Sequence, residues 1–171
     1  YKIWSVDGGV GYSTTGNTAN AMTPCPNVSL PVTQGFNAAT IPGCWTSQFV
    51  TGSSAIQYVT GSSYPTTTPQ EGTHYVYWNS FSISSGNSTR LVSPPITTTG
   101  TASVDLNFYC MHDPGYVGYT EGVYVEYSTD GTTWTQVGSL ISRYDATLTG
   151  WNLKTVTLPA GAGNQATVYV G

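Results

Sequence analysis

Apolar and polar residues alternate in short stretches along most of the chain. Alternation with a period of two is typical of β-strands that bury one face. In residues 102–111 the apolar side chains on one face are Val104, Leu106, Phe108 and Cys110. In residues 122–128 the same spacing relates Val123, Val125 and Tyr127. We find no stretch with the apolar stripe of a helix, so the pattern predicts an all-β chain.

The strands expected from this pattern follow one another at short intervals, separated by segments rich in Gly, Pro, Asn and Asp. They lie at residues 45–50, 56–60, 74–79, 89–92, 102–111, 122–128, 133–137, 152–158 and 166–170. About nine strands with such spacing predict a jelly-roll β-sandwich of two antiparallel sheets. This domain is expected to span residues 35–171 and to lack its last strand. A proline-rich linker is expected at residues 24–34, after a two-stranded hairpin at residues 1–23.

Composition narrows the classes of partner. Only 7% of the 171 residues are charged, and the net charge is −4. With so few Lys and Arg residues, the chain cannot form the basic surface that binds nucleic acid. No apolar run is long enough to insert in a membrane. A surface of hydroxyl groups in place of charges favours an extracellular or cell-surface location for a secreted protein.

The chain has three cysteines. Cys25 and Cys44 both lie in segments rich in Pro and Gly, where a disulfide is geometrically easy, and we expect them to be bonded. Cys110 lies in an apolar strand and is expected to be a buried free thiol. The alternative is that all three cysteines are reduced.

Several motifs occur in order after residue 35. The runs LVSPPI at residues 91–96 and VEYSTDGTTW at residues 125–134 are the most specific of them. Together they resemble the MAM-like family, in particular the cleaved-adhesin domains of exported Bacteroidetes proteins. The resemblance implies a jelly-roll module beside neighbouring domains of the same long chain. The segment that begins at Tyr1 resembles the end of a fibronectin type III-like domain, which often accompanies such modules.

The resemblance also implies a calcium site, because jelly rolls of this kind often use Ca²⁺ to tie the opening segment to the sheet. Asp113 and Glu121 match acidic positions of the family, whereas Asn37 and Asn79 carry an amide where relatives have acidic residues. Carboxylate and amide oxygens are the ligands that Ca²⁺ prefers. The alternative is that Asp113 and Glu121 only cap a turn and accept hydrogen bonds from loop amides.

No arrangement typical of an enzyme is found in the sequence. The two histidines, His74 and His112, are not accompanied by a nucleophile motif such as G-x-S-x-G, and no pair of carboxylates is singled out. Tyr116 and Tyr119 lie in the loop 112–121, where no strand periodicity assigns them to a core. We expect them to bind a ligand, although they could instead cover the end of the sandwich.

These features favour a non-catalytic adhesion or binding module of a large exported bacterial protein. Its partner is expected to be a glycan or a cell-surface protein. A second interpretation is an accessory carbohydrate-binding domain of a secreted polysaccharide-degrading enzyme. A third is a structural spacer that extends the chain from the cell.

Overall fold

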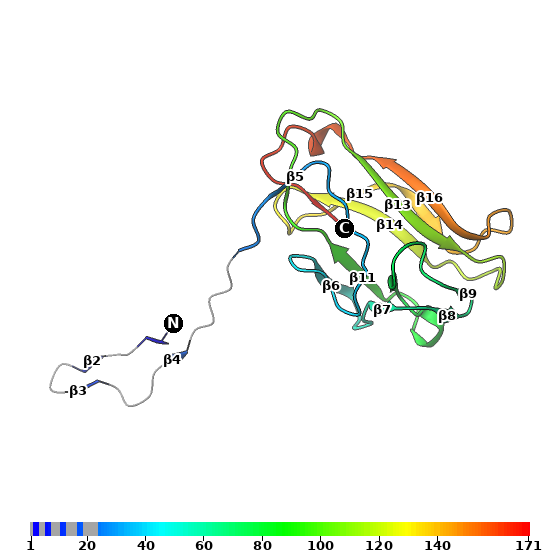
Figure 1. The fold of residues 1–171 in the computed structure, drawn as a ribbon, viewed down its shortest axis with the longest axis horizontal. Helices are drawn as coiled ribbons and strands as arrows, with labels where there is room; N and C mark the ends of the chain where they lie inside the picture. The colour runs from blue at the N-terminus through cyan, green and yellow to red at the C-terminus, as the bar shows by residue number, and fades with distance from the viewer. Residues whose placement is uncertain (1, 4–5, 8–10, 13–16, 19–23) are drawn as a thin grey trace.

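The computed structural model describes residues 2–3, 6–7, 11–12, 17–18 and 24–171 (Figure 1). Its regular elements in these residues are strands and two short 3₁₀-helices, η1 (Ser80–Ser82) and η2 (Ala160–Ala162). The all-β class predicted from the sequence is therefore confirmed. No helix in the described part of the chain has the length and apolar character needed to cross a membrane.

Two antiparallel layers enclose the main core (Figure 1). One layer pairs β13 (Asp105–His112) with β16 (Gly150–Thr157) along all 8 residues of each strand. The other places β14 (Gly122–Ser128) between β15 (Thr135–Ser142) and β17 (Tyr169–Val170). Because alternate residues of a strand point to opposite faces, each layer gives one row of side chains to the core.

The core is built from small and medium apolar side chains. Its buried members are Val125, Leu158, Ala162 and Val168. The residues that pack around them include Val104, Leu106 and Phe108, which the sequence pattern placed on one face of β13. The register between β14 and β15 shifts between Val123 and Val125, because the extra residues lie in β15 between Val137 and Ile141. Val125 is buried in the core, whereas Val123, nearer the start of β14, is 45% exposed.

Smaller ladders flank these layers. β6 (Thr46–Thr51) pairs with β11 (Ser88–Val92), and β7 (Gln57–Val59) pairs with β10 (Tyr75–Tyr77), both antiparallel. A two-stranded hairpin joins β8 (Ser62–Ser63) to β9 (Thr66–Thr67). Each of the nine strands expected beyond residue 35 overlaps one of the strands in Figure 1.

Part of the predicted linker belongs to the sandwich. β5 (Val28–Ser29) pairs in parallel with β12 (Ile96–Thr97), and the Asn27 side chain donates a 2.7 Å hydrogen bond to the carbonyl of Ala166. The expectation that residues 24–34 form only a linker is therefore wrong, because Val28 has a strand partner. A polar, proline-rich composition did not indicate this pairing.

The residues described before residue 24 form four short strands. β1 (Lys2–Ile3) pairs with β4 (Asn17–Thr18), and β2 (Val6–Asp7) pairs with β3 (Gly11–Tyr12), both antiparallel. Tyr1, on which the fibronectin type III-like resemblance begins, lies outside the described residues. That resemblance stays a prediction.

The expected disulfide between Cys25 and Cys44 is present, with 5.6 Å between the two Cα atoms. Such bonds are typical of extracellular and other oxidising compartments. Cys110 is free, as expected, but it is half-buried and not fully buried. Burial still raises the pKa of its thiol above the ordinary value, with a smaller opposing effect of Lys154. A thiol of this kind is a weak nucleophile at neutral pH.

Candidate functional site

The loop that joins β13 to β14 has an ion-paired base. Arg143, which directly follows β15, donates from Nη1 to Oδ2 of Asp113 at 2.8 Å. Its Nε donates to Oε1 of Glu121 at 3.0 Å. One guanidinium thus joins the two carboxylates that stand at either end of residues 113–121.

Backbone hydrogen bonds fix the same three residues. The N–H of Asp113 donates to the carbonyl of Arg143 at 2.9 Å, and the N–H of Arg143 donates to the carbonyl of Glu121 at 3.1 Å. Asp113 also accepts from the N–H of Gly115, and Glu121 accepts from the hydroxyl of Ser80. The loop base is therefore held by both main-chain and side-chain bonds, and we call Asp113, Glu121 and Arg143 the clamp.

The clamp shifts the titration of one of its carboxyls. Burial alone would raise the pKa of Glu121. Hydrogen bonds from its own backbone N–H and from Ser80, together with the charge of Arg143, outweigh burial and hold the pKa of Glu121 below its usual range. Glu121 is therefore ionised at neutral pH, as its pairing with a guanidinium requires.

The middle of the loop is exposed and apolar. Tyr116, Val117 and Tyr119 are 56%, 72% and 64% exposed, and we call these three residues the loop tip. The backbone turns sharply there, with positive φ angles at Tyr116 and Gly118. Arg143 reaches the tip as well, because its Nη2 donates to the carbonyl of Tyr116 at 3.4 Å. The tip thus presents large side chains to solvent on a fixed base.

The structure brings together two of the four residues expected to bind calcium. Asp113 and Glu121 converge, but on Arg143. Asn79 lies beside this group, since its neighbour Ser80 contacts Glu121, but its side chain caps η1 by accepting from the N–H of Phe81. Asn37 is bonded elsewhere, where its carbonyl accepts a 2.8 Å hydrogen bond from the hydroxyl of Thr73.

This arrangement does not fit a calcium ion. Oδ2 of Asp113 and Oε1 of Glu121 already accept hydrogen bonds from a guanidinium, which supplies positive charge where the ion would lie. A second cation would have to displace Arg143 or lie against it. No group of three or more His, Cys, Asp and Glu residues suited to a metal ion occurs in the described part of the chain. The alternative, that both carboxylates hold the loop, matches the observed contacts.

We therefore expect calcium to leave the stability of the protein unchanged. A ligand that binds only the folded state raises the melting temperature by mass action, so that removing it would lower the melting temperature. Thermal melting in EDTA and in excess CaCl₂ should give the same midpoint. MgCl₂ at the same ionic strength is the control. A midpoint that rises only with calcium would contradict the role we give to Arg143.

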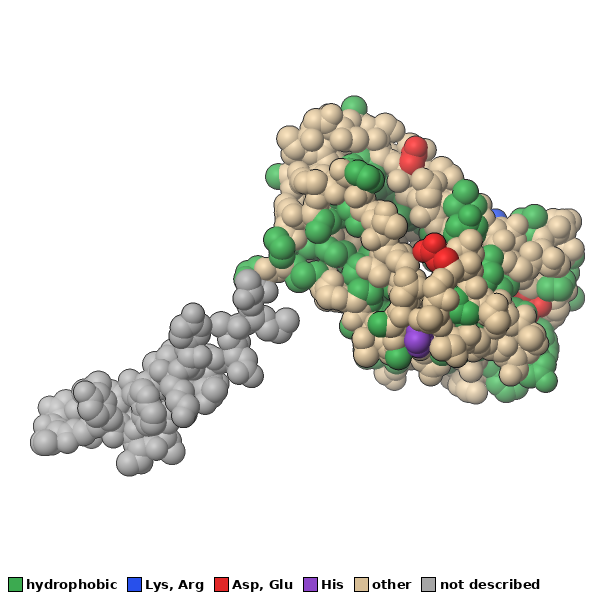
Figure 2. Space-filling view, in the orientation of Figure 1, with side chains coloured by type: hydrophobic (Ala, Val, Ile, Leu, Met, Phe, Trp, Pro, Cys, Tyr) green, Lys and Arg blue, Asp and Glu red, His purple; other side chains and the backbone are tan. Residues whose placement is uncertain are grey.

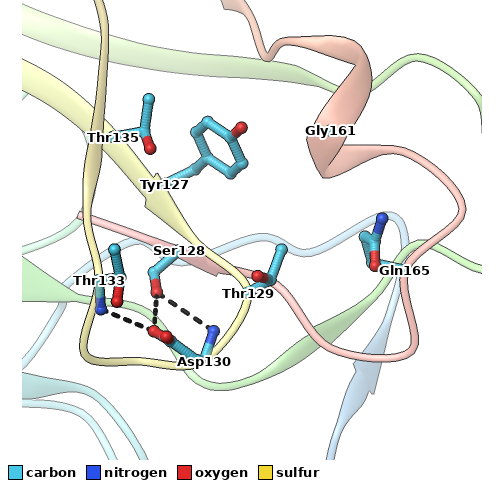
Figure 3. A pocket seen from close by; sticks show the side chains of 8 residues that line it. All are labelled: Tyr127, Ser128, Thr129, Asp130, Thr133, Thr135, Gly161 and Gln165. Atoms are coloured by element: carbon cyan, nitrogen blue, oxygen red, sulfur yellow. Dashed lines mark hydrogen bonds between the residues drawn. The ribbon is translucent and has the colours of Figure 1, made fainter.

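A pocket lies at the end of β14 that is farther from the loop tip (Figure 3). This pocket has a volume of about 360 Å³. Its lining combines the end of β14, the following turn, the start of β15 and the segment around η2: Tyr127, Ser128, Thr129, Asp130, Thr133, Thr135, Gly161 and Gln165. The sequence does not predict this pocket, because hydroxyl side chains are abundant along the whole chain.

His112, at the end of β13, is buried with neither ring nitrogen hydrogen-bonded to the described residues. Burial lowers the pKa of His112, and the positive charge of Lys154 lowers it further. The carboxylate of Asp145 and the backbone of Ser142 oppose these effects without cancelling them. No nucleophile is hydrogen-bonded to this ring in the described residues.

The lowered pKa of His112 predicts acid sensitivity. An unfolded chain protonates histidine near pH 6.5, whereas the folded protein resists protonation, so stability is lost as pH falls below about 6.5 towards the folded-state pKa. In His112→Phe this contribution is absent. Urea unfolding at about pH 7.5 and about pH 5 should show the parent losing roughly 1 kcal/mol more than the variant. Equal losses in both proteins would contradict the burial of a neutral imidazole.

Comparison of the chain with protein-family models, with curated proteins and with solved structures returned no match.

Proposed function

We propose that this chain is a non-catalytic adhesion module of a large exported bacterial surface protein, with a jelly-roll sandwich of the MAM-like, cleaved-adhesin kind. The observation that carries the proposal is the exposed loop tip on its ion-paired base. The disulfide, which is typical of oxidising compartments, supports an extracellular location.

The loop tip has the properties of a contact surface. Tyrosine combines a large apolar ring with a hydroxyl group, and it is enriched in protein interfaces for that reason. Three exposed apolar side chains within residues 116–119 leave apolar area in contact with water, which a partner would cover. The clamp limits the conformational freedom that the loop would lose on binding, and such preorganisation favours affinity.

The partner of the loop tip is expected to be a neutral surface of a cell-surface protein. Neutral side chains cover most of the face shown in Figure 2, and acidic and basic side chains on it are few. Arg143, which reaches the tip, is already bonded to two carboxylates. Affinity would therefore come from apolar contacts and neutral hydrogen bonds, and binding should change little with salt.

Replacing both tyrosines of the tip tests the proposal. Tyr116→Ser with Tyr119→Ser should reduce binding of the fluorescently labelled chain to epithelial cells by about ten-fold or more, the usual effect of removing central interface aromatics. Treating the cells with a protease beforehand should abolish the binding of the parent chain. A printed glycan array, run in parallel, reports binding to carbohydrate.

The matched control removes two other exposed aromatic residues. Tyr64 and Phe81 are 76% and 92% exposed, and Tyr64→Ser with Phe81→Ser should bind cells as the parent does. Equal loss in both double variants would indicate unspecific adhesion of apolar surface. Full binding by a correctly folded tip variant would favour the spacer interpretation.

A further inference from the structure

We infer that the pocket at the end of β14 binds a single neutral sugar unit, at a site separate from the loop tip. β14 spans 7 residues, and at about 3.3 Å per residue its two ends lie roughly 20 Å apart. The loop tip follows from one end of this strand, and the pocket surrounds the other. The inference therefore does not rest on the proposed adhesion function.

The pocket is held in shape before any ligand arrives. The hydroxyl of the buried Ser128 accepts from the N–H groups of Asp130 and Gly131, at 3.2 and 2.9 Å, and donates to Oδ1 of Asp130. The same Oδ1 accepts from the N–H groups of Thr132 and Thr133. The turn that forms one wall is thus fixed by five hydrogen bonds.

The opposite wall is fixed by a buried threonine. Thr98 is 1% exposed, and its hydroxyl donates to the carbonyl of Ala162 at 2.7 Å and accepts from the N–H of Gln165 at 2.9 Å. These bonds hold the segment that carries Gly161 and Gln165. A Cβ atom at Gly161 would lie 2.9 Å from the hydroxyl of Tyr127, so the glycine leaves room for that phenol group.

Neutral hydrogen-bonding groups are available inside the pocket. The side chains of Tyr127, Thr129, Thr135 and Gln165 line it, and none of them is hydrogen-bonded to another described residue (Figure 3). Three hydroxyls and one amide can each donate and accept, which suits a ligand with several hydroxyl groups. The ring of Tyr127 packs against the hydrophobic core, so its hydroxyl is the group that it offers to a ligand.

Charge in the pocket disfavours anionic ligands. Asp130 is the one carboxylate among the lining residues, and no Lys or Arg accompanies it. Hydrogen bonds from Thr133, Thr132 and Ser128 lower the pKa of Asp130, so it stays ionised and would repel a phosphate, a sulfate or a uronic acid. A volume of about 360 Å³ is at the small end of the range for ligand sites.

The test is a titration followed by the backbone amide signals of the ¹⁵N-labelled chain. The probes are the methyl α-glycosides of glucose, galactose and mannose, with glucuronate and glucosamine as charged comparisons. We expect at least one neutral glycoside to shift the amides of residues 128–135 and 160–165 in a saturable way. Glucuronate should bind more weakly than that glycoside, because the ionised Asp130 repels its carboxylate.

Two variants remove one hydroxyl each and keep the shape of the side chain. Tyr127→Phe and Thr135→Val should each weaken binding about three- to ten-fold, as expected for one lost neutral hydrogen bond. Tyr124→Phe is the matched control, because Tyr124 lies on the same strand, is 50% exposed and does not line the pocket. The amide spectrum of each variant shows directly whether it folds.

Three results would overturn the inference. The first is that none of the three glycosides shifts these amides in a saturable way. The second is that the parent and both hydroxyl-deleted variants bind with equal affinity. The third is that glucuronate binds more tightly than the neutral sugars. The double variant of Tyr116 and Tyr119 should keep the affinity of the pocket. Loss of cell adhesion and loss of sugar binding are therefore separable outcomes.

Discussion

Arg143→Ala is expected to lower the free energy of unfolding by about 3 kcal/mol, because it leaves two carboxylates without their counterion. Asp113 is 7% exposed, so its charge would stay in a poorly solvated position. The loss should be largest near neutral pH. It should shrink in acid, as protonation removes the charge of Glu121, whose pKa the clamp holds below its usual range. Urea unfolding at several pH values measures both effects.

Arg143→Lys is the matched control for this variant. An ammonium group keeps the charge but lacks the planar fork that joins Asp113 and Glu121 at once. Arg143→Lys should therefore lose about half as much free energy of unfolding as Arg143→Ala. Amide exchange of residues 113–121 should become faster in Arg143→Ala than in Arg143→Lys. A loss of less than about 1 kcal/mol in the alanine variant would mean that solvent screens the clamp as it screens ordinary surface pairs.

Opening the disulfide between Cys25 and Cys44 is expected to cost about 3 kcal/mol of stability. The two cysteines are separated by 19 positions in the sequence, and the bond restricts the unfolded chain over that loop. The same segment contributes β5 and Asn27 to the sandwich, so its release should also weaken those contacts. Cys25→Ser with Cys44→Ser, measured by urea unfolding, tests this expectation.

Two controls distinguish the effect of losing the disulfide from the effect of replacing a cysteine. Cys110→Ser should change stability by only about 1 kcal/mol, because Cys110 is half-buried and forms no disulfide. Dithiothreitol should lower the melting temperature of the parent but not that of the double variant. An unchanged parent in the reductant, with thiol titration giving three free cysteines, would contradict the prediction.

The strands were predictable because alternation is a local property of the sequence. Val104, Leu106 and Phe108 show it directly, and their partly buried side chains pack against the core on the face where the pattern placed them. Local patterns fail where the backbone departs from regular pairing. The register between β14 and β15 shifts opposite Val123 and Val125, where β15 continues through Gly138, whose positive φ allows a turn within the strand.

The clamp could be predicted only in part. The family resemblance drew attention to Asp113 and Glu121, whose carboxylates do converge. Arg143 is 30 positions from Asp113 and 22 from Glu121, and no local motif links the three. The rarity of basic residues was the available signal, since the chain has 8 Asp and Glu residues but only 4 Lys and Arg, so that pairing all the acidic residues needs two on each basic one. The pocket gave no signal, because its walls come from segments separated in the sequence.

The placement of the few basic residues also bears on proteolysis. Trypsin-like proteases cut after Lys or Arg and need an accessible, locally unfolded stretch of chain. Arg90 lies in β11, where it pairs with Glu126 and stacks on Trp134, while Lys154 lies in β16 and Arg143 is held in the clamp. Cleavage after any of these three residues requires ordered structure to open first. In a protease-rich medium the lifetime of residues 24–171 against such enzymes would thus follow the unfolding equilibrium of the sandwich.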